Sequence, residues 1–240
     1  MCMYSAKLVD QENMALFSQN NKDEFTLLRR KGFGASDSSI LLGLNKWTTL
    51  DQLIVQKNSK EITDEERAIG EKPQVRMGAD LEPLILQKFE DWANLVRGSV
   101  EKPDCQYRLQ DYPFLTVNYD GMWGDIPVEA KCISQFATKY WDFEKAIKSP
   151  SDCAVQKYGS ANSTIEKIKT QAKMVGIPDY YYTQVQQQLL GTTADHAYLA
   201  AISVKDWNLY VFHILEDEDV QSAIITAGQT IAEYCPEIPK

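Results

Sequence analysis

The segment Val128-Glu129-Ala130-Lys131 contains residue types from which a hydrolytic site could be built. In an extended strand, residues two apart share a face, so Glu129 and Lys131 point the same way while Ala130 points opposite. A Glu-x-Lys pair by itself means little, because most such pairs are solvated neighbours on an exposed sheet. A functional interpretation therefore depends on which other groups the fold brings to that face.

Two further carboxylates are candidates for the same face. Asp120 ends the preceding strand-like run, and a hairpin would carry it toward Glu129. Glu82 lies on a helical segment that could pack over the same sheet. Taken singly, Asp120 before Gly121 is also a common turn signal, and Glu82 is also a typical first-turn helix acid. Together, three carboxylates and a lysine predict a site for a hard cation such as Mg²⁺, where the lysine orients or helps deprotonate a water that attacks a phosphodiester.

A cation followed by a glycine-rich loop forms a second candidate site, for an anion. Arg29-Arg30-Lys31 precedes Gly32-Phe33-Gly34-Ala35-Ser36, and an apolar helical pattern follows. Ser36 suits the N-cap position of that helix, and a helix N-terminus beside a cation is a ready phosphate site. The alternative is a solvated basic turn. The residues alone leave both interpretations open.

Hydrophobic patterning predicts the elements that must position these groups. Strand-like runs cover residues 105–109, 114–119 and 127–132, and residues 120–125 join the last two in a hairpin or meander. A second predicted hairpin pairs 197–204 with 209–215 through a turn at 205–208. Helical spacing predicts helices over 47–57, from about 78 with Asp80 as N-cap and Pro83 in the first turn, over 180–190 and over 217–234. Residues 60–73 are expected to form a loop, and 157–173 shows little apolar periodicity.

Composition bounds the class of protein. The chain has 240 residues, 44% of them hydrophobic and 25% charged, which is enough to bury a core. Its net charge of −9 gives no global basic field, so a nucleic-acid function requires a local basic surface. Residues 138–173 could provide such a surface, because this stretch contains seven lysines and only four acidic residues. No apolar run approaches the roughly 20 residues of a membrane span, and no signal peptide is evident, so a cytoplasmic protein without a membrane partner is expected.

Cysteine usage excludes several classes of site. The five cysteines are widely spaced and include no Cys-x-x-Cys pair, which argues against a disulfide framework, a zinc ribbon or an iron–sulfur cluster. The aromatic residues Trp92, Trp123, Trp141 and Trp207 are expected in the core, and none is assigned to a ligand.

Further motifs occur in a fixed order. They are Arg29 with Gly32-Phe33-Gly34-Ala35-Ser36-Asp37, Gly78 with Leu81-Glu82-Pro83, Asn118-Tyr119-Asp120-Gly121, Glu129-Ala130-Lys131, Pro178 with Tyr181 and Gln184, and His196-Ala197-Tyr198-Leu199. In this order, over about residues 29–215, the chain resembles the YqaJ-type viral recombinases, the bacteriophage lambda exonuclease branch of the PD-(D/E)XK nucleases. The resemblance implies one α/β domain over residues 1–240, of restriction-endonuclease-like class, with a central mixed sheet flanked by helices.

The resemblance also implies a role for each matching residue. The metal ligands would be Glu82, Asp120, Glu129 and the carbonyl of Ala130, the catalytic residues Glu129, Lys131 and Gln184, and the 5′-phosphate ligands Arg29 and Ser36. Tyr181 would lie one turn before Gln184 on the same helix face. Of the neighbouring Gln186, Gln187 and Gln188, only some can face the site, and the rest are expected at the surface or in oligomer contacts.

The activity that the resemblance implies is a Mg²⁺-dependent 5′→3′ exonuclease, with Mn²⁺ as a substitute, acting on double-stranded DNA ends and leaving 3′ overhangs. The implied partners are two further copies in a ring-shaped homotrimer and a single-strand annealing protein. Two alternatives remain: an endonuclease of the same superfamily, and a catalytically altered nuclease fold that binds DNA ends or a host protein. Survival of Glu82, Asp120, Glu129, Lys131 and Gln184 together favours an active enzyme.

One region departs from the family pattern. The stretch between Lys131 and Gln184 is longer than the compact lambda enzyme requires, which indicates an insertion at about residues 145–175. Its lysines could line a DNA path or cover the site, but a charged, weakly periodic surface loop is the more frequent explanation.

Overall fold

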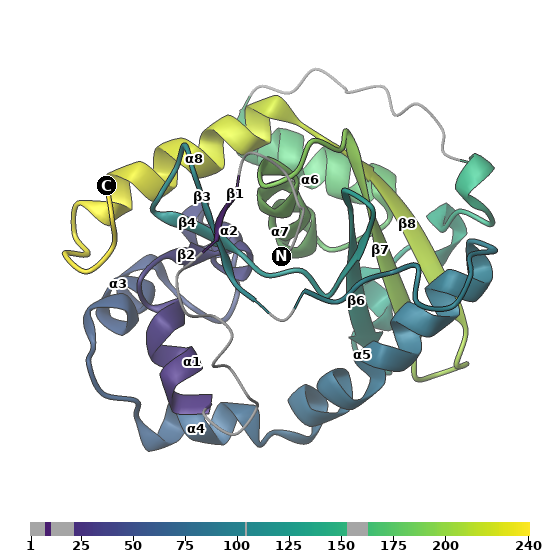
Figure 1. Cartoon of the computed structure of the whole chain (residues 1–240), viewed down its shortest axis with the longest axis horizontal. Helices are drawn as coiled ribbons and strands as arrows, with labels where there is room; N and C mark the ends of the chain where they lie inside the picture. Colours follow the sequence, from purple (N-terminus) through teal and green to yellow (C-terminus); the bar gives the residue numbers. More distant parts are fainter. Residues whose placement is uncertain (1–7, 11–21, 104, 153–162) are drawn as a thin grey trace.

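The computed structural model describes residues 8–10, 22–103, 105–152 and 163–240. Within them the chain forms an α/β fold with two four-stranded sheets, ordered β1-β3-β4-β2 and β5-β6-β7-β8, and helices packed around both (Figure 1). Mixed sheets flanked by helices were expected and are confirmed. The strands divide between two mixed sheets instead of lying in one.

The second sheet is built around β6 (Ile126–Ile133), which carries the Glu-x-Lys pair. It pairs in parallel with β7 (His196–Ser203), where Glu129 lies opposite Leu199, and antiparallel with the short β5 (Gly121–Trp123). The hairpin of β7 with β8 (Leu209–Leu215) forms as predicted. Parallel neighbours need a long crossover, and helices between β6 and β7 supply it.

The first sheet is smaller. It contains β1 (Leu8–Asp10), β3 (Tyr107–Leu109), β4 (Leu115–Val117) and β2 (Phe33–Gly34). Strands β3 and β4 are antiparallel, whereas β2 and β4 are parallel. The predicted hairpin between 114–119 and 127–132 is therefore wrong, since β4 belongs to this sheet and β5 takes its place beside β6. The chain crosses from one sheet to the other at Asp120.

Helix α5 (Pro73–Trp92) covers one face of the second sheet. Its Ile85, Leu86 and Phe89 pack in a buried cluster with Val128 and Ala130 of β6. The helix begins at Pro73, where a missing N–H costs nothing, and not near Gly78. Asp80 is therefore not its N-cap, and Pro83 and Glu82 lie in its interior instead of its first turn.

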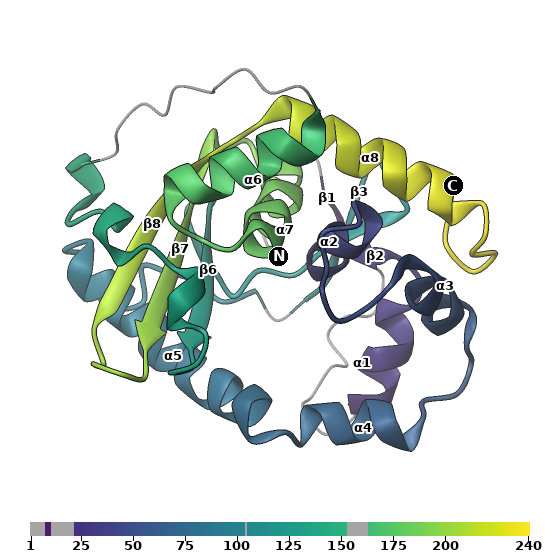
Figure 2. The ribbon, with the colours of Figure 1, turned by 180° about the vertical axis from the view of Figure 1, so that it is seen from behind.

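Helices α6 (Thr164–Val175) and α7 (Asp179–Leu190) pack on the opposite face, and α8 (Glu218–Ala232) packs against both of them, as the reverse view shows (Figure 2). Their apolar sides share a core with Leu199 and Phe212 of the sheet. The expectation of a surface loop over 145–175 is wrong for 164–175, because Ile168 and Ala172 of α6 are buried. The rest of the lysine-rich stretch includes 153–162, which lie outside the described residues, and the short 3-10 helices η3 (Thr138–Tyr140), η4 (Phe143–Lys145) and η5 (Pro150–Asp152).

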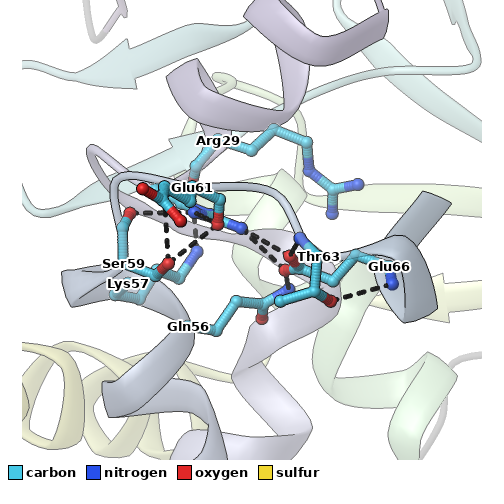
Figure 3. A network of polar contacts seen from close by, with 8 residues as sticks. Arg29, Gln56, Lys57, Ser59, Glu61, Thr63 and Glu66 are labelled. Atoms are coloured by element: carbon cyan, nitrogen blue, oxygen red, sulfur yellow. Dashed lines mark hydrogen bonds and ion pairs between the residues drawn. The ribbon is translucent and has the colours of Figure 1, made fainter.

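The N-terminal helices are α1 (Lys22–Arg29), α2 (Ser38–Leu41), α3 (Leu50–Asn58) and α4 (Asp64–Gly70). The predicted loop over 60–73 is wrong, because Thr63 and Glu66 form a capping box that starts α4. Helix α4 buries no residue of its own. Arg30, 5% exposed, holds it by donating to both Glu66 oxygens at 2.7 and 2.8 Å and to the carbonyls of Ser59 and Glu61 at 2.8 and 2.9 Å (Figure 3).

The tryptophans follow the expected pattern with one exception. Trp141 is buried, and Trp92 and Trp123 pack against the cluster beneath α5. Trp207 is 56% exposed, in the turn between β7 and β8, where its backbone takes a positive φ of 59°. Within the described part of the chain, no helix is long and apolar enough to cross a membrane.

Candidate active site

Glu129 is a buried carboxylate at the centre of the candidate site. Its side chain is 2% exposed and points from β6 toward α7, away from the α5 face. Lys131 Nζ and Gln184 Nε2 donate to Oε1, and Gln188 Nε2 donates to Oε2 at 2.6 Å. A carboxylate out of water requires such partners, and hydrogen bonds to a charged acceptor are the stronger ones. The fold therefore holds this one side chain in a fixed position from three sides.

Helix α7 supplies the two glutamines. Gln184 and Gln188 are four residues apart and share a helix face. Gln188 is itself fixed. Its Nε2 also donates to the backbone carbonyl of Asn118 at 3.0 Å, and its backbone carbonyl accepts from Tyr119 Oη at 3.1 Å. The sequence analysis missed Gln188, although its spacing from Gln184 was the signal that could have found it.

The expectation that some of Gln186, Gln187 and Gln188 lie at the surface is wrong, because all three are buried. Gln187 Nε2 donates to the carbonyls of Phe33 and Thr116 at 2.8 and 3.0 Å. Gln186 Nε2 donates to the carbonyl of Leu215 at 2.8 Å. Gln186 thus joins α7 to β8, and Gln187 joins it to β2 and β4.

Asp120 reaches the site at the crossing between the two sheets. Its Oδ2 accepts from the backbone N–H of Ala130 at 2.9 Å and lies 4.0 Å from Lys131 Nζ. Burial and then the Glu129 charge raise the pKa of Asp120 to about 7, with Glu82 adding to the rise, while Lys131 and the Ala130 N–H oppose it. Near neutral pH the Asp120 carboxyl is therefore about half protonated.

Lys131 remains a cation in this setting. Burial lowers the pKa of its ammonium, but the carboxylates of Glu129 and Asp120 more than compensate, and the net pKa is raised. The ammonium also lies 5.2 Å from the centroid of the Tyr181 ring, a cation–π contact that holds it over α7. Because it carries its proton at neutral pH, Lys131 is suited to orienting a nucleophile or holding negative charge, and not to accepting a proton.

Glu82 is only loosely part of this group. Its helix packs on the Val128 and Ala130 face of the sheet, opposite the Glu129 side chain. Its Oε1 accepts from Lys102 Nζ at 2.6 Å. Among the described residues, no set of three or more His, Cys, Asp or Glu side chains is gathered closely enough to hold a metal ion. The structure thus brings Asp120, Glu129, Lys131 and Gln184 together and leaves Glu82 paired elsewhere.

The donor set nevertheless fits a hard cation. Asp120 and Glu129 offer carboxylate oxygens, the ligands that Mg²⁺ prefers, and Asp120 Oδ2 is already fixed by the Ala130 N–H. In this structure Lys131 Nζ donates a hydrogen bond to Glu129 Oε1, so a cation that binds this oxygen would displace the ammonium. Glu82 would join only by exchanging Lys102 for the ion.

The second candidate site is assembled, although not as predicted. Arg29 Nη2 donates to Ser36 Oγ at 3.0 Å, and both side chains are exposed. In Figure 3 the Arg29 side chain runs away from the polar network beside it. Ser36 as an N-cap is wrong, because it lies inside the short 3-10 helix η2 (Ala35–Asp37), which starts after Gly34.

A buried lysine holds this loop in place. Lys57 Nζ donates to the carbonyls of Arg29 and Gly32 at 2.9 and 2.7 Å and to Asp37 Oδ2 at 2.7 Å. Asp37 Oδ2 in turn accepts from the N–H of Gly34 at 2.9 Å. Since Gln187 of α7 binds the carbonyl of Phe33 in the same loop, one helix contacts both the acid cluster and the Arg29 loop.

Comparison with known proteins identifies the family. The model of the YqaJ-like viral recombinase domain matches residues 24–195. The chain belongs to this family. A relative, the uncharacterized protein YqaJ of Bacillus subtilis (strain 168), is 32% identical over 142 residues, which cover 58% of this chain and 42% of the relative. The chain thus matches less than half the length of that protein.

Solved structures confirm the fold class. The alkaline exonuclease LHK-Exo from Laribacter hongkongensis superimposes with a TM-score of 0.58 at 16% identity, over 90% of this chain and 94% of that one. The same enzyme in complex with dAMP gives a TM-score of 0.57 at 16% identity and the same coverage. The α/β fold is therefore of the lambda-exonuclease type, in agreement with the restriction-endonuclease-like class expected from the sequence.

Proposed function

We propose that the chain is a metal-dependent deoxyribonuclease that hydrolyses phosphodiester bonds. One observation carries this proposal: a buried glutamate, Glu129, is held by Lys131, Gln184 and Gln188, while Asp120 is fixed on the backbone of the next residue. Stability alone gives little reason to gather two carboxylates in a low-dielectric site. Membership of a viral recombinase family supports DNA as the substrate.

Each side chain has a distinct role in this proposal. Asp120 and Glu129 hold Mg²⁺, for which Mn²⁺ substitutes, and the carbonyl of Ala130 and the carboxylate of Glu82 complete the ligand set. A bound Mg²⁺ lowers the pKa of its water and offsets charge on the phosphate. Lys131, released from Glu129, directs its ammonium at the attacking oxygen or the phosphate. Gln184 and Gln188 keep the Glu129 carboxylate in place as charge moves.

The finer proposal is a 5′→3′ exonuclease on double-stranded ends that leaves 3′ overhangs. The exposed pair of Arg29 and Ser36 supplies a guanidinium and a hydroxyl for a terminal 5′-phosphate. Its loop and the acid cluster are joined through α7, so a phosphate held at one place sets the position of the scissile bond at the other. We further propose a ring-shaped homotrimer and a single-strand annealing protein as partners, as the resemblance of the sequence motifs implies.

The test is digestion of a linear duplex labelled at one 5′ end, carrying either phosphate or hydroxyl there, with Mg²⁺ or EDTA. We expect metal-dependent loss of nucleotides from the 5′ end, faster with phosphate, and at least a hundredfold slower with Lys131→Ala. Lys88→Ala, at a partly exposed lysine of α5, is the matched control and should digest at the wild-type rate.

Two other results would select the alternatives. Internal cuts in a closed circular duplex would indicate an endonuclease on the same scaffold. Absence of hydrolysis with either metal, while DNA ends are still bound, would indicate a fold kept for binding only.

A further inference from the structure

A group of aromatic side chains extends from the active site to the protein surface. The Tyr181 ring lies beneath the Lys131 ammonium, and the Tyr180 ring lies 4.5 Å from Tyr181, centroid to centroid. Trp47 meets Tyr180 edge-on at 5.1 Å and 78°. The Trp47 side chain is 68% exposed, whereas Tyr181 is largely buried. The group therefore passes from the catalytic lysine to the surface within three rings.

Two lysines and another tyrosine widen this surface. Lys46 Nζ lies 5.1 Å and Lys139 Nζ lies 5.0 Å from the centroid of the Tyr140 ring, which is 51% exposed. The loop that carries Lys46 and Trp47 therefore contacts both the 3-10 helix that carries Tyr140 and, through the Trp47 ring, Tyr180 of α7.

A shallow hollow of about 300 Å³ continues the surface. It is lined by Lys139, Tyr140, Trp141, Lys169, Lys173 and Asp179, among others. Lys169 and Lys173 are exposed on successive turns of α6. The carboxylates of Asp142 and Asp179 line it too, but each accepts from a backbone N–H nearby, of Glu144 at 3.2 Å and Tyr180 at 3.0 Å.

This exposure is unlike that of the aromatic residues that build the core. Trp141 is 8% exposed. Trp47 leaves most of its indole in water, although its backbone N–H is fixed by the Asn45 side chain at 2.9 Å. Aromatic and basic side chains interleaved on one surface are the features of a platform for single-stranded nucleic acid, in which bases stack on rings and phosphates meet cations. Four lysines gather here in a chain whose net charge is −9, so this surface supplies the local positive potential that DNA needs.

We propose that Lys46, Trp47, Lys139, Tyr140 and Tyr180 form a binding platform for single-stranded DNA beside the catalytic residues. The inference rests on the proposed function for its choice of DNA. Bases stack on Trp47 and Tyr140, while Lys46 and Lys139 contact the phosphates on either side. Only unpaired bases can present their faces to a ring, so the platform takes a single strand and not an intact duplex. The strand then reaches the active site along Tyr180 and Tyr181.

The experiment measures binding without hydrolysis. Full-length protein in EDTA is titrated against a fluorescent single-stranded oligothymidylate, and the fluorescence anisotropy gives Kd. Trp47→Ala and Tyr140→Ala should each raise Kd about tenfold, as expected when one base loses its stacking partner. Trp47→Phe, which keeps a ring, should stay within about threefold of wild type. Lys46→Ala should reduce the slope of log K against log salt by about 0.7, the value for one phosphate on a single strand.

Matched controls lie elsewhere on the molecule. Tyr234 is 63% exposed and Lys60 is 85% exposed, and both lie beside the C-terminal segment, where Lys60 is 3.9 Å from Glu237 and the Tyr234 carbonyl accepts from Asn58 at 2.8 Å. Tyr234→Ala and Lys60→Ala should bind the oligonucleotide as wild type does. A second probe, a blunt duplex, should respond to Trp47→Ala by less than threefold.

The outcomes separate this inference from the proposed nuclease activity. If the wild type digests DNA but Trp47→Ala and Tyr140→Ala bind the single strand unchanged, the platform is refuted and the nuclease stands. If the wild type fails to bind the oligonucleotide at low salt, the platform is refuted as well, and a protein becomes the better candidate for this surface. If no DNA is digested but the variants lose binding as described, the platform stands without the nuclease.

Discussion

Asp120→Asn is the change whose effect the site predicts most sharply. In the folded protein the pKa of Asp120 is raised from 3.8 to about 7, first by burial and then by Glu129. An acid whose folded pKa is raised favours the folded state fully below the unfolded pKa, and that stability is lost as pH rises through the folded pKa. Here the loss falls between about pH 4 and pH 7, because the unfolded chain releases its proton first.

The magnitude follows from the same values. A difference of about 3 between the two pKa values corresponds to at most about 4 kcal/mol, at about 1.4 kcal/mol for each pKa unit. Since 26% of the side chain remains exposed, screening by water reduces this, and we expect about 2 kcal/mol. Asparagine cannot ionise, yet its carbonyl still accepts from the Ala130 N–H. The variant should therefore be more stable than wild type at pH 8 by about 2 kcal/mol, and the advantage should largely vanish near pH 4.5.

The assay is urea unfolding in EDTA at both pH values, followed by circular dichroism. At a slope of about 2 kcal/mol per molar urea, the expected difference moves the midpoint by about 1 M at pH 8. Asp111→Asn, a change at an exposed acid between β3 and β4, is the control for a general loss of negative charge. An Asp120→Asn effect that is equal at the two pH values, or a variant that is less stable at pH 8, would refute the electrostatic argument.

Three further predictions concern neighbouring contacts. Gln188→Ala removes a hydrogen-bond donor from buried Glu129 and should lower the free energy of unfolding, measured by urea denaturation, by about 1–3 kcal/mol. It should also slow DNA digestion at least tenfold. Unchanged digestion would exclude Gln188 from the site. Arg30→Met removes the bidentate pair that anchors α4 and should cost about 2 kcal/mol, while opening residues 60–72 to trypsin; wild-type resistance would contradict the anchoring role. Arg29→Ala should abolish the preference for 5′-phosphorylated ends in digestion assays, whereas Lys31→Ala, at the neighbouring exposed lysine, should keep it.

The parts of the fold that the sequence predicted well are those governed by local pattern. The β7–β8 hairpin and helices α7 and α8 came from clear periodicity, and the strand with Glu129 and Lys131 came from alternation. Helix α4 was missed because it buries nothing, so its sequence carries no apolar stripe. Only the capping pair of Thr63 and Glu66 marked its start, and the ion pair that holds it comes from Arg30, 36 residues earlier.

The acid cluster was only partly predictable from local sequence pattern. Alternation placed Glu129 and Lys131 on one face, and the turn at Asp120 did bring that carboxylate to Ala130. The route differed, because Asp120 marks the crossing between two sheets and not a hairpin within one. Glu82 was expected near the same cluster; its charge does act on Asp120, but its helix packs on the Val128 and Ala130 face of β6, which no single-strand pattern reveals. The spacing of Gln188 from Gln184 placed both on one face of α7, but its bond to Glu129 and the exposure of Trp47 depend on tertiary packing.

The most direct test of the central claim is the initial rate of nucleotide release from a linear duplex by wild type and by Glu129→Gln, with saturating Mg²⁺. Glutamine keeps the shape of the side chain and removes only its charge, so folding, checked by circular dichroism, should be retained. The account predicts that release falls at least a thousandfold in the variant and is absent in wild type with EDTA. Release by Glu129→Gln at a rate within tenfold of wild type would contradict the assignment of Glu129 as the centre of a metal-dependent nuclease site.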